Sequence, residues 1–215
     1  MRSRTAAVIG SHTATGAELI KELCSRKIYD EVIILSESHT SYTHEKISER
    51  IIDFRYIEAA HFGVVDDVFC CIQPSADDDW FDPLKLASAV KHSNASQYLV
   101  ISSMGADARS VLRLNRRYGK YEQQLQRLAF PSLHIFRPSI LLTDPVEYGV
   151  KESVAERAMT FAGWAMIGPL KTYKGIRASQ LALAMTEKAL DERFPTLAIY
   201  QSGEIENTKR RETKA

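Results

Sequence analysis

A glycine-flanked loop between an apolar strand and a helix constrains this sequence more than any other feature. The stretch "AVIGSHTATGAEL" places Gly10 and Gly16 after the apolar run 5–10 and at the start of a helical pattern over 15–26. Such a loop exposes backbone N–H groups at a helix N-terminus, where the phosphates of a nucleotide bind. The sequence therefore predicts a nucleotide-binding strand–loop–helix unit at its beginning.

Apolar strands and amphipathic helices alternate through the rest of the chain. Further strands are expected as short apolar runs at 31–37, 50–54, 67–73, 97–103, 132–142 and 196–202. Further helices are expected at 82–94, 113–128, 151–166 and 178–190. Continuous apolar runs indicate strands that are covered on both faces, as in parallel sheets. We therefore expect an α/β fold: a Rossmann-like doubly wound parallel sheet with helices on both faces and a small C-terminal substrate-side elaboration.

Length and charge limit the domain organisation and the partners. We expect one domain over residues 1–205, with 143–205 forming the substrate side and 206–215 a charged, frayed tail. The formal net charge is +1, and no apolar run approaches the roughly 18 residues of a membrane span, so neither nucleic acid nor a membrane is expected as a partner. The three cysteines fit no metal-ligand spacing, and no metal site is expected. A cytoplasmic location is the default expectation, and a homodimer is compatible with the sequence.

Five further residues are candidates for binding a dinucleotide. Thr13 occupies the middle of the loop, and its hydroxyl and that of Thr15 are candidate phosphate donors; His12 lies in the same loop. Glu37 ends the second expected strand, where an acid accepts hydrogen bonds from ribose hydroxyls. Asp53, after the third, is placed to meet an adenine amino group. Because no arginine directly follows Glu37, NAD is favoured over NADP, and a solvated strand end is the alternative role for both acids.

Four segments in this order resemble the atypical short-chain dehydrogenase/reductases: "AVIGSHTATGAEL", "YLVISSMGAD", "GKYEQQL" and "LHIFRPSILL". The resemblance covers roughly residues 5–205. It is to the Tat-interacting-protein-like branch and its small bacterial relatives described as nucleoside-diphosphate-sugar epimerases. It implies a Rossmann fold that binds NAD or NADP, commonly NADPH. It also implies oxidoreductase chemistry on a small carbonyl or nucleotide-sugar-like substrate.

The resemblance also implies catalytic residues. In that superfamily a serine after the fifth strand binds the substrate carbonyl, a tyrosine protonates it, and a lysine lowers the tyrosine pKa and holds the nicotinamide ribose. Carried over to this chain, Ser103 is the serine and Lys120 is the lysine. Ser102 lies beside Ser103, and Pro138 and Ser139 match the loop near the nicotinamide.

The proton donor departs from that pattern. Four residues before Lys120 the chain has Arg116, which stays protonated at neutral pH and cannot donate the proton. Tyr118 is the available phenol, but it lies about 200° around the helix from Lys120. Arg116 is instead a candidate anchor for an anionic substrate.

Two hypotheses stay open: an NAD(P)-dependent oxidoreductase, or a catalytically silent dinucleotide-binding sensor or interaction module. A third hypothesis is that the chain binds no dinucleotide at all.

Overall fold

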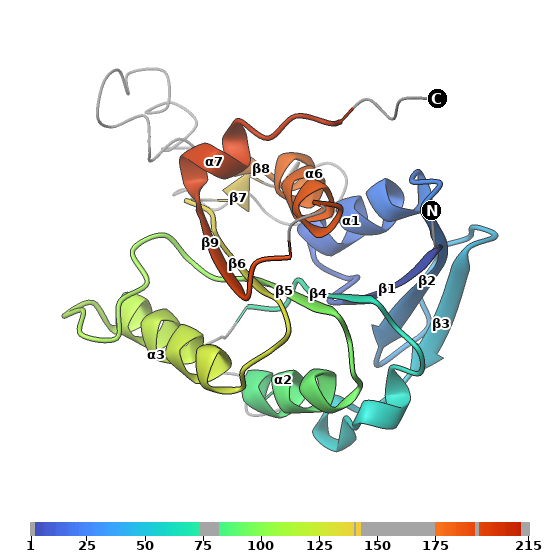
Figure 1. The fold of residues 1–215 in the computed structure, drawn as a ribbon, viewed down its shortest axis with the longest axis horizontal. Coiled ribbons are helices and arrows are strands. Elements are labelled where there is room, and N and C mark those ends of the chain that lie inside the picture. The colour runs from blue at the N-terminus through green and yellow to red at the C-terminus, as the bar shows by residue number, and fades with distance from the viewer. Residues whose placement is uncertain (1–2, 74–81, 140, 143–174, 192–193, 212–215) are drawn as a thin grey trace.

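The computed structural model describes residues 3–73, 82–139, 141–142, 175–191 and 194–211 (Figure 1). Their core is a seven-stranded sheet in the order β3-β2-β1-β4-β5-β6-β9, in which every neighbouring pair is parallel. Its strands, in chain order, are β1 (Arg4–Ile9), β2 (Tyr29–Ser36), β3 (Ile47–Ile51), β4 (Asp67–Cys70), β5 (Gln97–Ile101), β6 (Leu133–Arg137) and β9 (Leu197–Gln201). A separate pair joins β7 (Leu141–Leu142) to β8 (Ile176–Arg177).

Helices cover both faces of this sheet. On one face lie α1 (Ala14–Cys24) and α6 (Ala178–Ala189), and on the other α2 (Pro83–His92) and α3 (Arg113–Arg127) (Figure 1). Two 3-10 helices, Phe54–Tyr56 and Ala59–His61, connect β3 to β4, and α7 (Ser202–Glu206) follows β9. The predicted α/β Rossmann-like fold class is confirmed.

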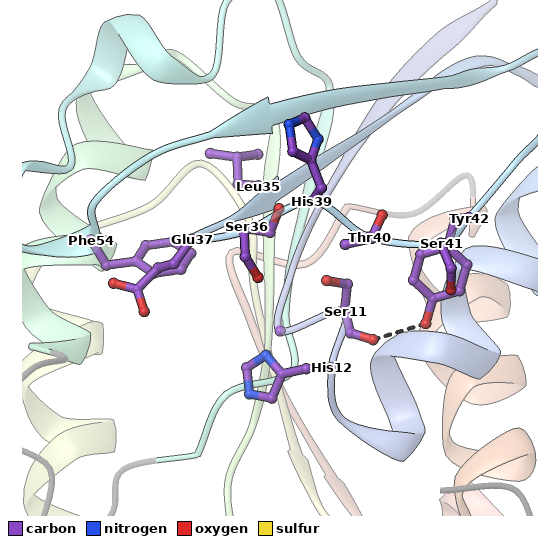
Figure 2. A pocket seen from close by; sticks show the side chains of 12 residues that line it. Ser11, His12, Leu35, Ser36, Glu37, His39, Thr40, Ser41, Tyr42 and Phe54 are labelled. Atoms are coloured by element: carbon purple, nitrogen blue, oxygen red, sulfur yellow. Dashed lines mark hydrogen bonds between the residues drawn. The ribbon is translucent and has the colours of Figure 1, made fainter.

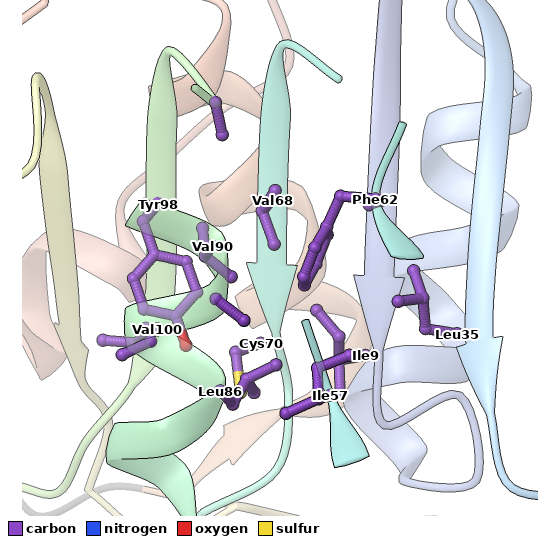
Figure 3. Packing of buried hydrophobic residues seen from close by; sticks show 14 of the residues in the cluster. Ile9, Leu35, Ile57, Phe62, Val68, Cys70, Leu86, Val90, Tyr98 and Val100 are labelled. Atoms are coloured by element: carbon purple, nitrogen blue, oxygen red, sulfur yellow. The ribbon is translucent and has the colours of Figure 1, made fainter. Parts of the chain in front are cut away.

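The hydrophobic core has two halves because the central strands are apolar on both sides. In β1, Ala6 and Val8 face the α1–α6 layer, whereas Ala7 and Ile9 join the cluster beneath α2. Figure 3 shows this second cluster, with Leu86 of α2 beside Cys70 of β4. Since both faces of the sheet are packed, polar side chains that meet a ligand are expected at the strand ends.

The strand order places a crevice at one of those ends. β1 lies between β2 and β4, so the chain leaves β1 in one direction and returns from β3 to the other side. At this switch point the loops after β1 and β4 diverge, and ligands bind there at the carboxyl ends of the strands.

The third strand differs from its prediction. The structure has β3 at Ile47–Ile51 rather than 50–54. Asp53 accepts a hydrogen bond from the Arg55 N–H and starts a 3-10 helix at Phe54, so the chain turns before it can continue as a strand. The strand therefore lies a few residues earlier in the chain than predicted.

The C-terminal region adds a strand to the sheet and a helix to one of its faces. The described residues 176–201 supply β9 beside β6 and α6 against α1, so they complete the sheet and its helical layer. The predicted helix at 151–166 lies outside the described residues. In the described part of the tail, Arg210 pairs with Glu22, and Arg211 lies 3.0 Å from Asp191; fraying of the tail stays a prediction. None of the helices that the structure describes has the length and apolar composition needed to cross a membrane.

Candidate functional site

The loop between β1 and α1 has the tight geometry that its glycines predict. Gly10 has a φ of +89°, and a Cβ there would lie 2.8 Å from Cγ1 of Ile72. A Cβ on Gly16 would lie 2.1 Å from the Gly10 carbonyl oxygen. Helix α1 therefore begins directly against the end of β1, which directs its first N–H groups toward the carboxyl edge of the sheet.

Thr13 closes this loop rather than presenting its hydroxyl to a ligand. Its Oγ1 donates to the Gly10 carbonyl (2.8 Å) and accepts from the Gly16 N–H (3.0 Å), so Thr13 is the N-cap of α1. This capping role occupies the hydroxyl that the sequence suggested as a phosphate donor. Within the described chain, four backbone N–H groups of the loop have no acceptor and remain for a phosphate: those of Ser11, His12, Ala14 and Thr15.

A cavity of about 490 Å³ opens beside this loop. Residues 10–12 of the loop, 35–42 and Phe54 line it. Figure 2 shows Ser36 and Glu37, from the end of β2, together with Ser11 and His12 from the loop. Its volume lies in the range of small-molecule sites. The structure thus brings the predicted residues Gly10, His12 and Glu37 to one cavity.

Ser36 adds a polar group that the sequence reasoning missed. Its side chain is buried, and its Oγ has no hydrogen-bond partner in the described structure. A buried hydroxyl without a partner is unfavourable, and such groups are uncommon in folded proteins. A ligand in the cavity would supply the missing partner. The available signal was a serine directly before Glu37, at the end of an otherwise apolar strand.

The outer wall of the cavity is fixed by hydrogen bonds. The carboxylate of Glu49 accepts from the Thr40 N–H (2.7 Å) and lies 2.8 Å from Nδ1 of His39. These bonds with Thr40 and His39 lower the pKa of Glu49. On the other side, the Tyr42 hydroxyl donates to the Ser11 carbonyl (2.9 Å), as Figure 2 shows. Hydrogen bonds between protein groups therefore hold this part of the cavity wall.

Asp53 lies close to this cavity but is engaged elsewhere. Its carboxylate pairs with the Arg55 guanidinium at 2.6 Å, and this hydrogen bonding lowers the pKa of Asp53. Phe54, the next residue, lines the cavity. A role for Asp53 at an adenine stays a prediction, and it would require the carboxylate to share its bonds with Arg55.

At the ends of β5 and β6 a buried carboxylate organises the site. Glu122 of α3 accepts hydrogen bonds from Ser102 Oγ (2.6 Å), Arg137 Nε (2.9 Å) and Arg137 Nη2 (2.5 Å). Gln73 donates to the Ser102 carbonyl (3.0 Å). The predicted cofactor residue Ser102 thus anchors α3 with its hydroxyl. Ser103 is half-buried beside it, and its Oγ donates a long hydrogen bond to the Met104 carbonyl (3.5 Å).

Lys120 and Arg116 lie on a different side of α3 from the buried stripe. Tyr118, Glu122 and neighbouring residues are buried, whereas Lys120 is exposed. The prediction that Tyr118 and Lys120 face apart is confirmed. Lys120 and Arg116 instead line a second cavity with the first turn of α2, so they do not share the cavity of Gly10 and Glu37.

Tyr118 lies nearer the carboxyl edge than Glu122 does. Helix α3 follows β5 and precedes the parallel strand β6, so it runs back from that edge. Tyr118 precedes Glu122 by one turn on the same buried face, about 6 Å along the axis. Burial raises the pKa of the Tyr118 phenol, which keeps it protonated at neutral pH. Tyr121, by contrast, belongs to the core beneath α2.

The segment after β6 meets the segment after β5. The Met104 N–H donates to the Pro138 carbonyl (2.9 Å), and the Ser139 N–H donates to Ser202 Oγ (3.1 Å). These bonds place Pro138 close to Ser103, as a shared site requires. Among the described residues, no group of three or more His, Cys, Asp or Glu side chains could hold a metal ion.

The fold and the loop define a class: a Rossmann-fold protein with a phosphate-type loop at the carboxyl edge of its sheet. No protein-family model matches the chain. Protein HTATIP2 of Rattus norvegicus is 25% identical over 173 residues, covering 73% of this chain and 71% of that protein. The mitochondrial protein FMP52-1 of Scheffersomyces stipitis is 25% identical over 224 residues, covering 94% and 96%.

Solved structures share the fold at low identity. MoeE5 in complex with UDP-glucuronic acid and NAD has a TM-score of 0.64 and 14% identity, covering 91% of this chain and 75% of that one. An NADPH-dependent quinone oxidoreductase (QOR2) from Escherichia coli has a TM-score of 0.62 and 13% identity, covering 91% and 67%. These structures share the Rossmann fold with this chain, and the similarity to HTATIP2 confirms the predicted resemblance to the Tat-interacting-protein-like branch.

Proposed function

We propose that the chain binds a nicotinamide dinucleotide at the carboxyl edge of its sheet, with the adenosine half in the 490 Å³ cavity. One observation carries this proposal: the same cavity is lined by Glu37 and by Ser11 and His12, two of the loop residues whose N–H groups are unpaired in the described structure. A pyrophosphate needs the first feature and a ribose diol needs the second. The unpartnered Ser36 hydroxyl offers one further polar contact.

The lining of this cavity favours NAD over NADP. The Glu37 carboxylate can accept from both ribose hydroxyls, whereas it would repel a 2′-phosphate. Among the described lining residues there is no arginine or lysine. Arg55 interacts electrostatically with Glu37, but its guanidinium is paired with Asp53. The compared structures include both an NAD complex and an NADPH-dependent enzyme, so the preference rests on Glu37.

We further propose oxidoreductase chemistry on a small carbonyl or nucleotide-sugar-like substrate. When bound, the dinucleotide supplies or accepts the hydride. In this proposal Ser103 orients the substrate carbonyl, and the phenol of Tyr118 donates the proton. The Pro138 carbonyl accepts a hydrogen bond from the Met104 N–H, so Pro138 lies at the same end of the site. Tyr118 thereby takes the role of acid without the neighbouring lysine that the superfamily uses.

A catalytically silent dinucleotide-binding protein is the second candidate. The placement of Lys120 in a different cavity favours it, because the phenol of Tyr118 then lacks the lysine that lowers the tyrosine pKa in the superfamily. The two candidates share the cofactor and differ only in turnover.

A thermal-shift series with NAD⁺, NADH, NADP⁺ and NADPH tests the proposal. Ligand at about a hundred times its dissociation constant adds about 2.7 kcal/mol of stability. For a domain of this size that raises the melting temperature by roughly 5–10 °C. The NAD forms are expected to stabilise more than the NADP forms. No shift with any of the four contradicts the proposal, and a shift without carbonyl reduction over a substrate panel selects the silent alternative.

A further inference from the structure

A second cavity, of about 580 Å³, lies between the first turn of α2 and helix α3. Four cations of α3 line it, and their spacing places them along one stripe of the helix: Arg113, Arg116, Arg117 and Lys120. Asp82 is the acidic residue in the described lining, which therefore carries a net charge of +3. None of these residues lines the 490 Å³ cavity.

Most of these positive charges have no acidic partner within the described structure. Arg113, Arg117 and Lys120 have no hydrogen bond or ion pair within the described structure, and Arg116 donates to the Ser110 carbonyl at 2.8 Å. The Asp82 carboxylate already accepts from the first N–H groups of α2. Elsewhere in the structure, cations of this kind commonly pair with an acid, as Arg26 does with Glu22. A cavity lined by cations that lack an acidic partner in the described structure is suited to an anionic ligand.

We propose that this cavity binds the phosphate or diphosphate group of a small molecule. Guanidinium forks match phosphate oxygens with paired hydrogen bonds, and the volume is that of a small-molecule site. A lining charge of +3 calls for a ligand with more than one negative charge. A phosphomonoester carries about −1.5 to −2 at neutral pH, whereas a carboxylate carries only one.

The position of the cavity agrees with a second ligand. The first turns of α2 and α3 both lie at the carboxyl edge of the sheet, since each helix runs antiparallel to the strands it connects. A second copy of the chain is a poor occupant, because a symmetric contact would bring the basic stripe against itself. The proposal does not rest on dinucleotide binding, which uses other residues.

Calorimetric titration of the full chain with inorganic pyrophosphate tests this site. The variant Arg113→Gln/Arg117→Gln removes two cations, the exposed Arg113 and the half-buried Arg117, that have no hydrogen bond or ion pair among the described residues. Each lost charge-assisted contact is expected to weaken binding about tenfold, so the double variant binds about a hundredfold more weakly. Arg127→Gln is the matched control, because Arg127 is exposed on the same helix but outside the lining, and it is expected to bind like wild type.

Three results would overturn the assignment. The first is an absence of pyrophosphate binding, and the second is equal binding by wild type and the double variant. The third is complete displacement of pyrophosphate by NAD⁺, which would place it on the β1–α1 loop instead. A parallel arm uses vesicles containing a phosphoinositide. Binding of soluble pyrophosphate supports a free small molecule, whereas binding to vesicles alone assigns the surface to a lipid headgroup and overturns the proposal.

Discussion

Removing either partner of the Glu122–Arg137 pair is predicted to destabilise the fold strongly and non-additively. Glu122 is 2% exposed and accepts three hydrogen bonds, from Ser102 and from two nitrogens of Arg137. It ties α3 to the ends of β5 and β6. Losing one partner of a buried ion pair costs about 3–5 kcal/mol, because the other charge is left without compensation.

Glu122→Leu is therefore expected to lower the free energy of unfolding by about 3–5 kcal/mol. At about 2–4 °C per kcal/mol for a domain of this size, the melting temperature falls by roughly 6–20 °C. Arg137→Leu leaves the more deeply buried charge, that of Glu122, without its partner. It is expected to lower the free energy of unfolding by a similar amount. The double variant recovers most of the loss, apart from about 1–3 kcal/mol for the Ser102 hydroxyl that loses its acceptor.

Urea unfolding followed by circular dichroism measures all four free energies. The expected coupling energy between the two substitutions is at least about 2 kcal/mol. Additive losses, or single losses below about 1 kcal/mol, would refute the assignment of Glu122 as a buried anchor. Arg55→Gln is the control, because the Asp53–Arg55 pair is exposed and its loss is expected to leave the unfolding midpoint nearly unchanged.

Three further predictions concern the site and the pH dependence. Glu37→Ala is expected to weaken NAD⁺ binding about tenfold or more while NADP⁺ binding changes less, whereas Asp30→Ala, an exposed acid at the other end of β2, changes neither in calorimetry. Tyr118→Phe is expected to lower kcat for carbonyl reduction by about a hundredfold or more with an unchanged dissociation constant for the cofactor; unchanged kcat contradicts its role as acid. Burial lowers the pKa of His134 from 6.5 to about 4, so the unfolded chain takes up a proton that the folded chain does not, and stability falls by roughly 3 kcal/mol as pH drops from 6.5 to 4. His134→Gln, which can still hydrogen-bond to Tyr200, is expected to flatten this slope in urea unfolding; an unchanged slope contradicts the assignment of the slope to His134.

The fold was largely predictable because its determinants are local. Continuous apolar runs marked the central strands, and Asp82 with Pro83 marked the start of α2, where Asp82 is indeed the N-cap. The exception, β3, is an edge strand whose residues are half-buried, so its apolar signal is weak. Ion pairs of the tail, such as Arg210 with Glu22, join residues far apart in the sequence, so local patterns do not reveal them.

The site was predictable only where it depends on short segments. Gly10, Gly16 and Glu37 follow from the spacing of one βα unit, and the structure brings the loop and Glu37 to one cavity. The hydroxyl of Thr13 was assigned to a ligand because its bonds to the backbone depend on the exact turn geometry. Lys120 was assigned by resemblance, and only the burial of the opposite stripe of α3 reveals that it faces another cavity.

Titration of NAD⁺ into the full chain and two glycine variants tests the central claim most directly. Gly16→Ala places a Cβ 2.1 Å from the Gly10 carbonyl oxygen, whereas a Cβ on Gly203 has no atom within 4 Å. Wild type and Gly203→Ala are predicted to bind NAD⁺ equally, and Gly16→Ala, checked for folding by circular dichroism, at least about tenfold more weakly. Absence of NAD⁺ binding to wild type, or equal binding by a folded Gly16→Ala variant, would contradict a dinucleotide site at this loop.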